Sequence, residues 1–381
     1  MKYLLLFIIS GFYVGGFSQE KESTKDNNIS YYGRKHFLIE GTAIADSLKE
    51  SPYDRLPISY KEKVRKPVWN LSKASAGITV RFHSNSTSIN LKWTVLNDFD
   101  MPHMASTGIK GIDLYTKYNN KWRYLTTAGA FVGLKTYQNK SIPADSINEY
   151  ELIKNMTPEF REYKLFLPLY DGVTKLEIGI DNNALINKAS PNPVKPIVFY
   201  GTSITQGGCA SRPGMAHTNI ISRKLDVDCI NYGFSGNGRM ETPIVELISE
   251  IDAQFYVIEC MQNMDSEQVT ERVRPLVDMI RTNHPYTPIV LVENMMYTMA
   301  FLDQTIKTRL IQENAALKNE YDKIIKSDIP NIFYIKDNKD FLLDNEGTVD
   351  GVHLTDLGFL RYSDYLIENF KKNLLIKVKL N

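Results

Sequence analysis

The chain has 381 residues, of which 43% are hydrophobic and 23% charged, as in an ordinary globular protein with room for about two domains. Its 45 Lys and Arg residues balance 44 Asp and Glu residues, which leaves a formal net charge of +1. This balance gives no electrostatic reason to expect nucleic acid or an anionic membrane as a partner. Beyond the N-terminus no apolar run is long enough for a membrane span.

The first residues have the pattern of an export signal. Lys2 supplies a positive start, an apolar run begins at Tyr3, and small residues follow as far as Ser18. We therefore predict a cleaved signal peptide over residues 1–19. The mature protein is expected to be secreted or periplasmic.

Residues 31–190 are predicted to form an N-terminal β-sandwich, jelly-roll-like in its architecture. Apolar and polar residues alternate over residues 78–82, 89–93 and 176–180, which indicates strands with one buried face. Turn residues separate these segments, as in Asn119-Asn120. Repeated short strands of this kind favour two packed sheets.

A proline-rich linker, with three prolines in residues 190–196, ends this pattern. Strands and helices then alternate, which predicts a second domain over residues 194–381 with a parallel sheet and helices on both faces. We expect the strand order 2-1-3-4-5 of doubly wound folds. The predicted strands are Ile197–Tyr200, Cys229–Tyr232, Gln254–Glu259, Pro288–Glu293 and Ile332–Ile335. The predicted helices are Met215–Leu225, Thr242–Ile251, Ser266–Thr282, Asp303–Lys326 and Leu357–Asn373, with Ser266 and Asp303 as expected N-caps.

Ser203 is the candidate nucleophile. It follows the buried apolar strand 197–200 in the turn Gly201-Thr202-Ser203, at the strand end where open α/β sheets place their sites. A serine there is a nucleophile when a base can reach it. The alternative is a phosphate-binding turn, but the glycine spacing and lysine of such loops are missing.

His353 is the candidate base. It precedes the last predicted helix, and Asp350, three residues earlier, can orient its ring. Asp100 and His103 have the same spacing, so the pattern alone is weak. Position favours the later pair, since it follows the last strand of the α/β domain whereas the earlier pair belongs to the β domain.

Two further strand ends carry candidate oxyanion donors. Gly236 lies in a glycine-rich turn after the second strand, and Asn263 follows the third strand with a side-chain amide. Donors directed at a developing oxyanion are what acyl transfer requires. Each is by itself more typical of a turn or cap residue, and the combination with Ser203, Asp350 and His353 is what favours catalysis.

The order Ser, Gly, Asn and Asp-x-x-His resembles the SGNH, or GDSL-type, hydrolases, which are esterases with a flavodoxin-like three-layer α/β/α fold. Upstream, Gly111-Ile112-Asp113-Leu114-Tyr115 is similar to the G-x-D-L-Y signature of a β domain that precedes some bacterial members. The first block reads Gly-Thr-Ser-Ile where the family has Gly-Asp-Ser-Leu, and Met261-Gln262-Asn263-Met264 replaces Gly-x-Asn-Asp. The resemblance implies an ester hydrolase with catalytic Ser203, His353 and Asp350, and with Ser203, Gly236 and Asn263 as the oxyanion hole.

The expected reaction is hydrolysis of short acyl esters, such as acetyl groups on a carbohydrate, with no cofactor or metal. Two alternatives remain at this point: an acyltransferase to a sugar acceptor, and a catalytically inactive carbohydrate-binding protein.

The three cysteines are Cys209, Cys229 and Cys260. Because strands one and three are neighbours in the expected order, we predict a disulfide between Cys209 and Cys260, with Cys229 buried and free.

Overall fold

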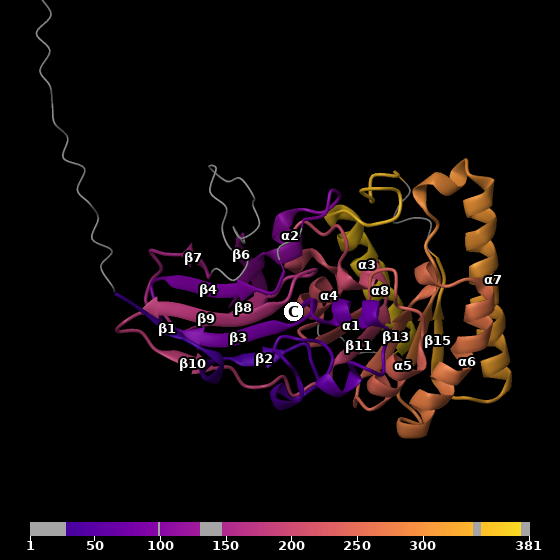
Figure 1. Cartoon of the computed structure of the whole chain (residues 1–381), viewed down its shortest axis with the longest axis horizontal. Helices are drawn as coiled ribbons and strands as arrows, with labels where there is room; N and C mark the ends of the chain where they lie inside the picture. Colours follow the sequence, from indigo (N-terminus) through magenta and orange to yellow (C-terminus); the bar gives the residue numbers. More distant parts are fainter. Residues whose placement is uncertain (1–27, 98–99, 130–146, 338–343, 375–381) are drawn as a thin grey trace, which may run out of the picture.

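The computed structural model describes residues 28–97, 100–129, 147–337 and 344–374. The predicted signal peptide lies outside these residues. Antiparallel sheets occupy one half of the molecule, and a parallel sheet with helices occupies the other (Figure 1). None of the helices in the described ranges is long and apolar enough to cross a membrane.

Two antiparallel sheets form the N-terminal half. The first has the order β1-β9-β4-β7, and the second has the order β10-β3-β8-β5-β6, with β2 paired to β3. In chain order the strands are β1 Ile29–Tyr32, β2 Leu38–Glu40, β3 Thr79–Ser84, β4 Ile89–Val95, β5 Ile112–Tyr118, β6 Lys121–Ala128, β7 Asn148–Ile153, β8 Arg161–Phe166, β9 Val173–Asp181 and β10 Ile186–Lys188.

The core of this half lies between the two sheets. Leu91 and Ile178 from the first sheet and Val80 and Leu165 from the second are fully buried in one cluster. Alternate residues of each strand enter that cluster, as the period-two pattern requires. The predicted sandwich of two sheets is therefore confirmed.

The C-terminal half contains a five-stranded parallel sheet in the order β12-β11-β13-β14-β15, which confirms the predicted 2-1-3-4-5 order. The predicted strands differ from the observed ones by at most a residue at either end. The observed strands are β11 Ile197–Gly201, β12 Cys229–Gly233, β13 Phe255–Glu259, β14 Ile289–Val292 and β15 Ile332–Ile335.

Eight helices accompany the strands in the described residues: α1 Lys66–Ser72, α2 Ser106–Lys110, α3 Ser203–Gln206, α4 His217–Leu225, α5 Thr242–Ser249, α6 Ser266–Asn283, α7 Gln304–Lys326 and α8 Asp356–Leu374. The predicted N-cap of α7 is confirmed, because the Asp303 side chain accepts from the N–H groups of Thr305 and Ile306. The helix at 266 is instead capped by Asp265, whose carboxylate accepts from Gln268 N–H at 2.9 Å.

Helices cover both faces of the parallel sheet. Val198 and Tyr200 of β11 point into a cluster with α5, α6 and α7, whereas Ile197 and Phe199 point into a second cluster with α4 and α8. A strand buried on both faces is continuously apolar, which is why residues 197–200 show no alternation in the sequence.

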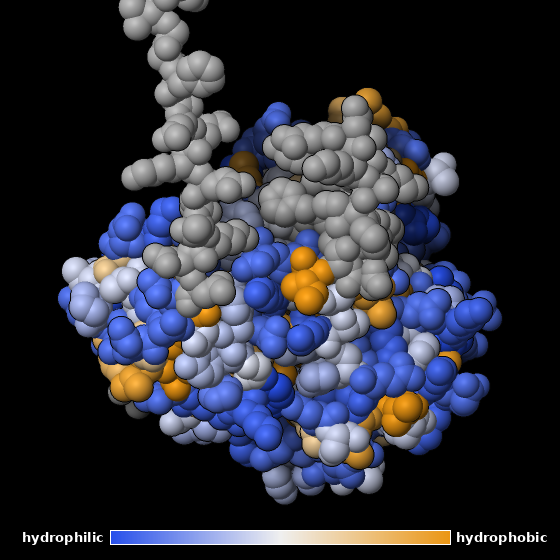
Figure 2. Space-filling model, turned by 60° about the vertical axis from the view of Figure 1, so that its left-hand side comes forward, coloured by the Kyte–Doolittle hydropathy of each residue, from blue (hydrophilic) through white to orange (hydrophobic). Residues whose placement is uncertain are grey.

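The two halves share their cores. Leu56, Val68 and Trp69, from the segment around α1, pack into the cluster formed by α5, α6 and the parallel sheet. Ile109 and Tyr170 join the cluster on the opposite face. Figure 1 places α1 against the parallel sheet, and Figure 2 shows that the outer side of the antiparallel half is mainly hydrophilic. The apolar surface of the N-terminal half is thus used largely between its sheets and against its neighbour.

Candidate active site

Ser203 begins α3 directly after β11, so the end of a buried strand fixes its position. Thr202 is the N-cap of this short helix, and its hydroxyl accepts from Ile204 N–H at 3.4 Å. Threonine and aspartate both serve as N-caps, so Gly-Thr-Ser keeps the local geometry that Gly-Asp-Ser would give. Ser203 is 8% exposed, and its N–H belongs to the first turn, where backbone donors lack intrahelical partners.

The structure brings Ser203, His353 and Asp350 together in one line of hydrogen bonds. Ser203 Oγ lies 2.9 Å from His353 Nε2, and His353 Nδ1 lies 2.7 Å from Asp350 Oδ2. The His353 and Asp350 side chains are 23% and 37% exposed, so solvent reaches the site. This geometry allows His353 to remove the Ser203 proton while Asp350 holds the ring.

A tight turn holds Asp350 beneath His353. Asp350 Oδ1 accepts from the N–H groups of Val352 at 3.1 Å and His353 at 2.8 Å, while Gly351 adopts a φ of +88° that favours glycine. Burial raises the pKa of Asp350, but the hydrogen bonds from His353 and Val352 lower it by a larger amount. The pKa of Asp350 is therefore below its usual value. Asp350 is therefore an anion at neutral pH.

The glycine-rich turn after β12 lies on the other side of the site. Gly236 has a φ of +67°, and Ser235 N–H donates to the Gln206 side chain at 3.0 Å, which ties this turn to α3. Gly238 approaches Gly201 so closely that an added Cβ would lie 1.8 Å from the Gly201 carbonyl oxygen. Only glycine permits that approach between the two turns.

Asn263 ends the 3₁₀ turn Met261–Asn263 after β13. With its Oδ1 toward the same turn, it accepts from Asn237 N–H at 3.0 Å and Gly238 N–H at 3.1 Å. The opposite orientation offers one longer contact, from Nδ2 to the Phe234 carbonyl at 3.3 Å. The two backbone donors decide the amide orientation and leave Nδ2 as the end that can donate elsewhere.

Arg55, which the sequence analysis did not single out, holds the end of β12, just before the glycine-rich turn, from the N-terminal half. Its buried guanidinium donates to the carbonyls of Gly233 at 2.6 Å and Asn231 at 3.2 Å on β12, the edge strand of the parallel sheet. It also bonds the carbonyls of Leu71 and Ala74. Burial lowers the pKa of Arg55 to about 10, which still leaves it cationic at neutral pH.

The Asp of the G-x-D-L-Y segment contacts the loop that follows α3. Asp113, at the start of β5, accepts from Arg212 Nη1 at 2.7 Å and from Gly214 N–H at 2.8 Å. The neighbouring Ser211 donates its N–H to Asp356, the first residue of α8, at 2.9 Å. The β domain is therefore linked through this loop to the chain that carries His353. The sequence pattern alone assigned no contact to Asp113.

A buried polar network supports α3 from below. Glu259, at the end of β13, accepts from Thr205 at 3.0 Å and Tyr362 at 2.7 Å, and His217 Nε2 lies 3.0 Å away. Burial raises the pKa of Glu259, but His217 and these hydroxyls lower it by a larger amount. The pKa of Glu259 is therefore below its usual value. Glu259 and His217 do not reach Ser203 Oγ, and their role is to hold the helix that carries it.

His103 belongs to the β domain, as predicted, yet its ring lies beside the site. The centroids of the His103 and His353 rings are 5.7 Å apart. Its sequence partner Asp100 instead contacts Ser106 at 3.1 Å and Lys110 at 3.2 Å. The Asp100 and His103 pair is thus no second triad, and domain packing places His103 at the rim.

The predicted disulfide is wrong, because all three cysteines are free and buried. Cys260 Sγ faces the Tyr200 carbonyl at 3.6 Å within the helix-covered core, whereas Cys209 lies at the turn after α3 with a φ of +73°. Burial, with a contribution from Asp350, raises the pKa of the Cys209 thiol to about 12. Cys209 is therefore a neutral thiol and no competing nucleophile beside Ser203.

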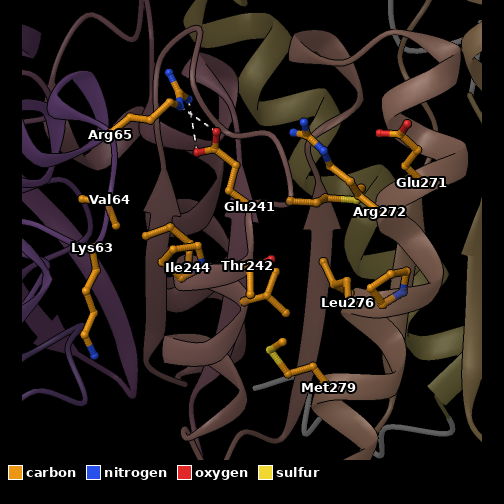
Figure 3. Close-up of a pocket in the computed structure, with 14 residues that line it drawn as sticks. Lys63, Val64, Arg65, Glu241, Thr242, Ile244, Glu271, Arg272, Leu276 and Met279 are labelled. Atoms are coloured by element: carbon orange, nitrogen blue, oxygen red, sulfur yellow. Dashed lines mark hydrogen bonds and ion pairs between the residues drawn. The ribbon is translucent and has the colours of Figure 1, made fainter.

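A cavity of about 410 Å³ lies near the glycine-rich turn, between residues 63–65 of the N-terminal half and α5 and α6 (Figure 3). Arg65 and Glu241 are paired at one end of it at 2.6 Å. Its lining does not include Ser203 or His353. The cavity is therefore separate from the hydrogen-bonded line of Ser203, His353 and Asp350.

Comparison with known proteins shows which family has this fold and site. Residues 194–371 match the GDSL-like lipase/acylhydrolase family, and residues 29–186 match the N-terminal GxDLY domain of SGNH hydrolase-type esterases. A putative GDSL-like lipase from Bacteroides ovatus is 33% identical, with a TM-score of 0.83, over 92% of this chain and all of that one. The chain belongs to the GDSL-like lipase/acylhydrolase family. It is an ester hydrolase of this family with an SGNH hydrolase fold.

Less similar solved structures share the fold alone. A salicylyl-acyltransferase from a tetracycline biosynthetic pathway is 14% identical with a TM-score of 0.73, over 93% of this chain and 99% of that one. A family two carbohydrate esterase from Cellvibrio japonicus is 11% identical with a TM-score of 0.56, over 91% and 98%. No curated protein matches the chain.

Proposed function

We propose that this GDSL-like hydrolase is a secreted serine esterase that removes short acyl groups, such as acetyl, from carbohydrates. The observation that carries the chemistry is the line from Ser203 Oγ to His353 Nε2 at 2.9 Å and from His353 Nδ1 to Asp350 at 2.7 Å. Nucleophile, base and orienting carboxylate are all within the reach that proton transfer needs.

In the proposed reaction, His353 Nε2 takes the Ser203 proton as Oγ attacks the ester carbonyl. The N–H groups of Ser203 and Gly236 and the Asn263 amide bind the oxyanion. When the tetrahedral intermediate collapses, the leaving alcohol takes the proton from His353 and an acyl-Ser203 ester remains. Water, deprotonated by His353, then releases the acid and restores Ser203. The Asp350 carboxylate keeps the imidazolium oriented throughout.

The carbohydrate part of the proposal draws on the neighbours. The Cellvibrio japonicus protein and one from Clostridium thermocellum are carbohydrate esterases by name, and the latter was solved in complex with cellohexaose. Solvent exposure of His353 and Asp350 suits a large alcohol that stays partly in water. The export signal expected over residues 1–19 suits an extracellular polymer.

The β domain is proposed to complete the substrate site. His103 borders His353, Arg55 holds the end of β12 from which the turn with Gly236 leaves, and Asp113 holds the loop after α3. Ligand pockets are common at such domain interfaces. This contribution distinguishes the β domain from an independent binding module on a flexible linker.

A chromogenic acetyl ester and an acetylated oligosaccharide test the proposal. We expect turnover of both by the wild type and loss of both in Ser203→Ala. Turnover that survives in Ser203→Ala, or no turnover of either ester by the wild type, would contradict it, the second outcome favouring an inactive carbohydrate-binding protein.

Acyl transfer to a sugar is the second candidate, favoured by the similarity in fold to an acyltransferase. Both reactions use the same acyl enzyme and differ only in the acceptor. Adding a free oligosaccharide to the chromogenic assay separates them: hydrolysis yields acetate at an unchanged rate, whereas a transferase yields the acetylated sugar in its place.

A further inference from the structure

Three side chains with metal-binding atoms converge beside Ser203. Ligand atoms of His103, Cys209 and His353 all lie within 4.8 Å of one another. They come from the β domain, from the turn after α3 and from the loop before α8, so no spacing in the sequence reveals them. Two imidazoles and a thiolate form a donor set that suits a borderline cation such as Zn²⁺.

Two of the three side chains have no hydrogen-bond partner in the part of the chain that the structure describes. Within the ranges that the structure describes, no group hydrogen-bonds to the His103 ring or to the Cys209 thiol, and the contact recorded for His103 is with the ring of His353. Cys209 is 7% exposed and is held in a left-handed conformation that is unusual outside glycine. Its thiol is thus fixed at the cluster without serving a hydrogen bond there.

The edge of His353 that carries Nε2 faces the turn that holds Cys209. An added Cβ on Gly208, the residue before Cys209, would lie 3.3 Å from His353 Cδ2, the ring atom bonded to Nε2. His353 Nδ1 is already engaged by Asp350 at 2.7 Å, as in metal sites where a carboxylate orients a ligating imidazole. Nε2 is therefore the nitrogen available to a cation, and it is the same atom that contacts Ser203 Oγ at 2.9 Å.

We propose that His103, Cys209 and His353 form an inhibitory site for Zn²⁺ or a similar borderline divalent cation. A tetrahedral zinc with bonds of roughly 2.0–2.3 Å needs its ligand atoms about 3.3–3.6 Å apart, so the separations between these atoms have to shorten by at most about 1.5 Å. Coordination expels the Cys209 thiol proton to solvent and replaces the Ser203 hydrogen bond at Nε2. The cation thereby removes the base from the reaction without touching the oxyanion donors.

The inference of inhibition rests on the proposed function, so the test reads binding and activity separately. Binding is measured by titrating the full mature chain with Co²⁺, which gives a thiolate-to-cobalt charge-transfer band when Cys209 coordinates. Activity is measured as the ratio of chromogenic ester turnover with and without Zn²⁺, and again after addition of EDTA. The variants are His103→Ala and Cys209→Ser, and the matched control is His36→Ala, an exposed histidine elsewhere in the β domain.

We expect one Co²⁺ per chain with a charge-transfer band that Cys209→Ser abolishes. His103→Ala should weaken Co²⁺ binding and Zn²⁺ inhibition by at least about tenfold, whereas His36→Ala should change neither. EDTA should restore turnover. Absence of the band in a folded, active wild type, or inhibition that neither variant weakens, would overturn the site. A band in a protein that hydrolyses no ester, even without metal, would keep the site and instead refute the proposed esterase.

Discussion

Asp113 of the β domain binds Arg212 of the α/β domain at 2.7 Å, and this contact gives the G-x-D-L-Y segment a physical role. The same carboxylate accepts from Gly214 N–H at 2.8 Å, and Ser211, just before Arg212, donates its N–H to Asp356 at the start of α8. The chain that carries His353 is thus held in part by a residue of the other domain.

We expect Asp113→Asn to lower kcat/KM by about 10- to 100-fold, since small displacements of catalytic groups cost that much. It should also destabilise the fold by about 2–4 kcal/mol, because Arg212 keeps its charge but loses its anion at an interface where Asp113 is fully buried. Steady-state kinetics and urea denaturation measure the two effects.

The control for that change is Lys117→Gln. Lys117 also joins the two domains, through Asp226 at 2.7 Å, but this pair is exposed on the surface. An exposed pair contributes about 0–1 kcal/mol, so activity and stability should stay close to wild type. Equal losses in the two variants would mean that any contact between the domains matters, and the specific role of Asp113 would be refuted.

Arg55→Lys is expected to lower the free energy of unfolding by about 2–4 kcal/mol. Lysine keeps the charge but cannot reach the four carbonyls that the guanidinium bonds, so buried acceptors on β12 and around α1 lose partners. Arg65→Lys, at the rim beside Glu241, is the matched control and should cost under about 1 kcal/mol. An Arg55→Lys protein with the free energy of unfolding of the wild type would show that these hydrogen bonds from the β domain do not stabilise β12.

Burial raises the pKa of Asp171 to about 6, although its Oδ1 accepts from the N–H groups of Asn97 and Gly172 at 2.8 Å each. The other oxygen, Oδ2, is buried and has no hydrogen-bond partner among the described residues. Because the folded-state pKa is raised, the folded protein binds more protons than the unfolded one between pH about 4 and 6. The contribution of Asp171 to the free energy of unfolding therefore falls as pH rises through this window, by about 3 kcal/mol in total.

Asp171→Asn keeps the Oδ1 acceptor and removes the titration. Its stability relative to wild type should rise between pH 4.5 and pH 7.5, and denaturation of both proteins at both pH values isolates this difference. A constant difference between the two proteins would show that Asp171 titrates in its ordinary range.

The α/β domain on its own is expected to fold poorly. Leu56, Val68 and Trp69 complete a core that α5, α6 and the parallel sheet cannot close alone, and Arg55 covers the β12 edge. A fragment of residues 193–381 should melt at least several degrees lower than the whole chain and bind a dye for exposed apolar surface. A fragment with the melting temperature of the whole chain would show that the shared core does not contribute to stability.

Local patterns in the sequence predicted the elements because they depend on neighbouring residues. The apolar run 197–200 defined β11, and the rule that sites lie at the carboxyl ends of parallel strands brought Ser203 together with His353 and Asp350. Asp265 replaced the expected cap because an acceptor one residue earlier caps as well, a shift that propensity does not resolve.

What the sequence could not predict depends on how the domains pack. In the sequence, Arg55 is an ordinary cation and Asp113 an ordinary strand residue. Their roles depend on contacts between the two halves. The Cys209–Cys260 bridge failed because neighbouring strands do not ensure that two side chains face each other. The cluster of His103, Cys209 and His353 joins three distant segments, which no spacing pattern records.

The most direct measurement of the central claim is mass spectrometry of the protein after reaction with an organophosphonate ester probe. One label per chain on Ser203, with turnover lost in proportion to labelling and reduced about 10⁵-fold or more in Ser203→Ala, is the result expected of the nucleophile. A label on another residue, or an unlabelled protein that still turns over the ester, would contradict it.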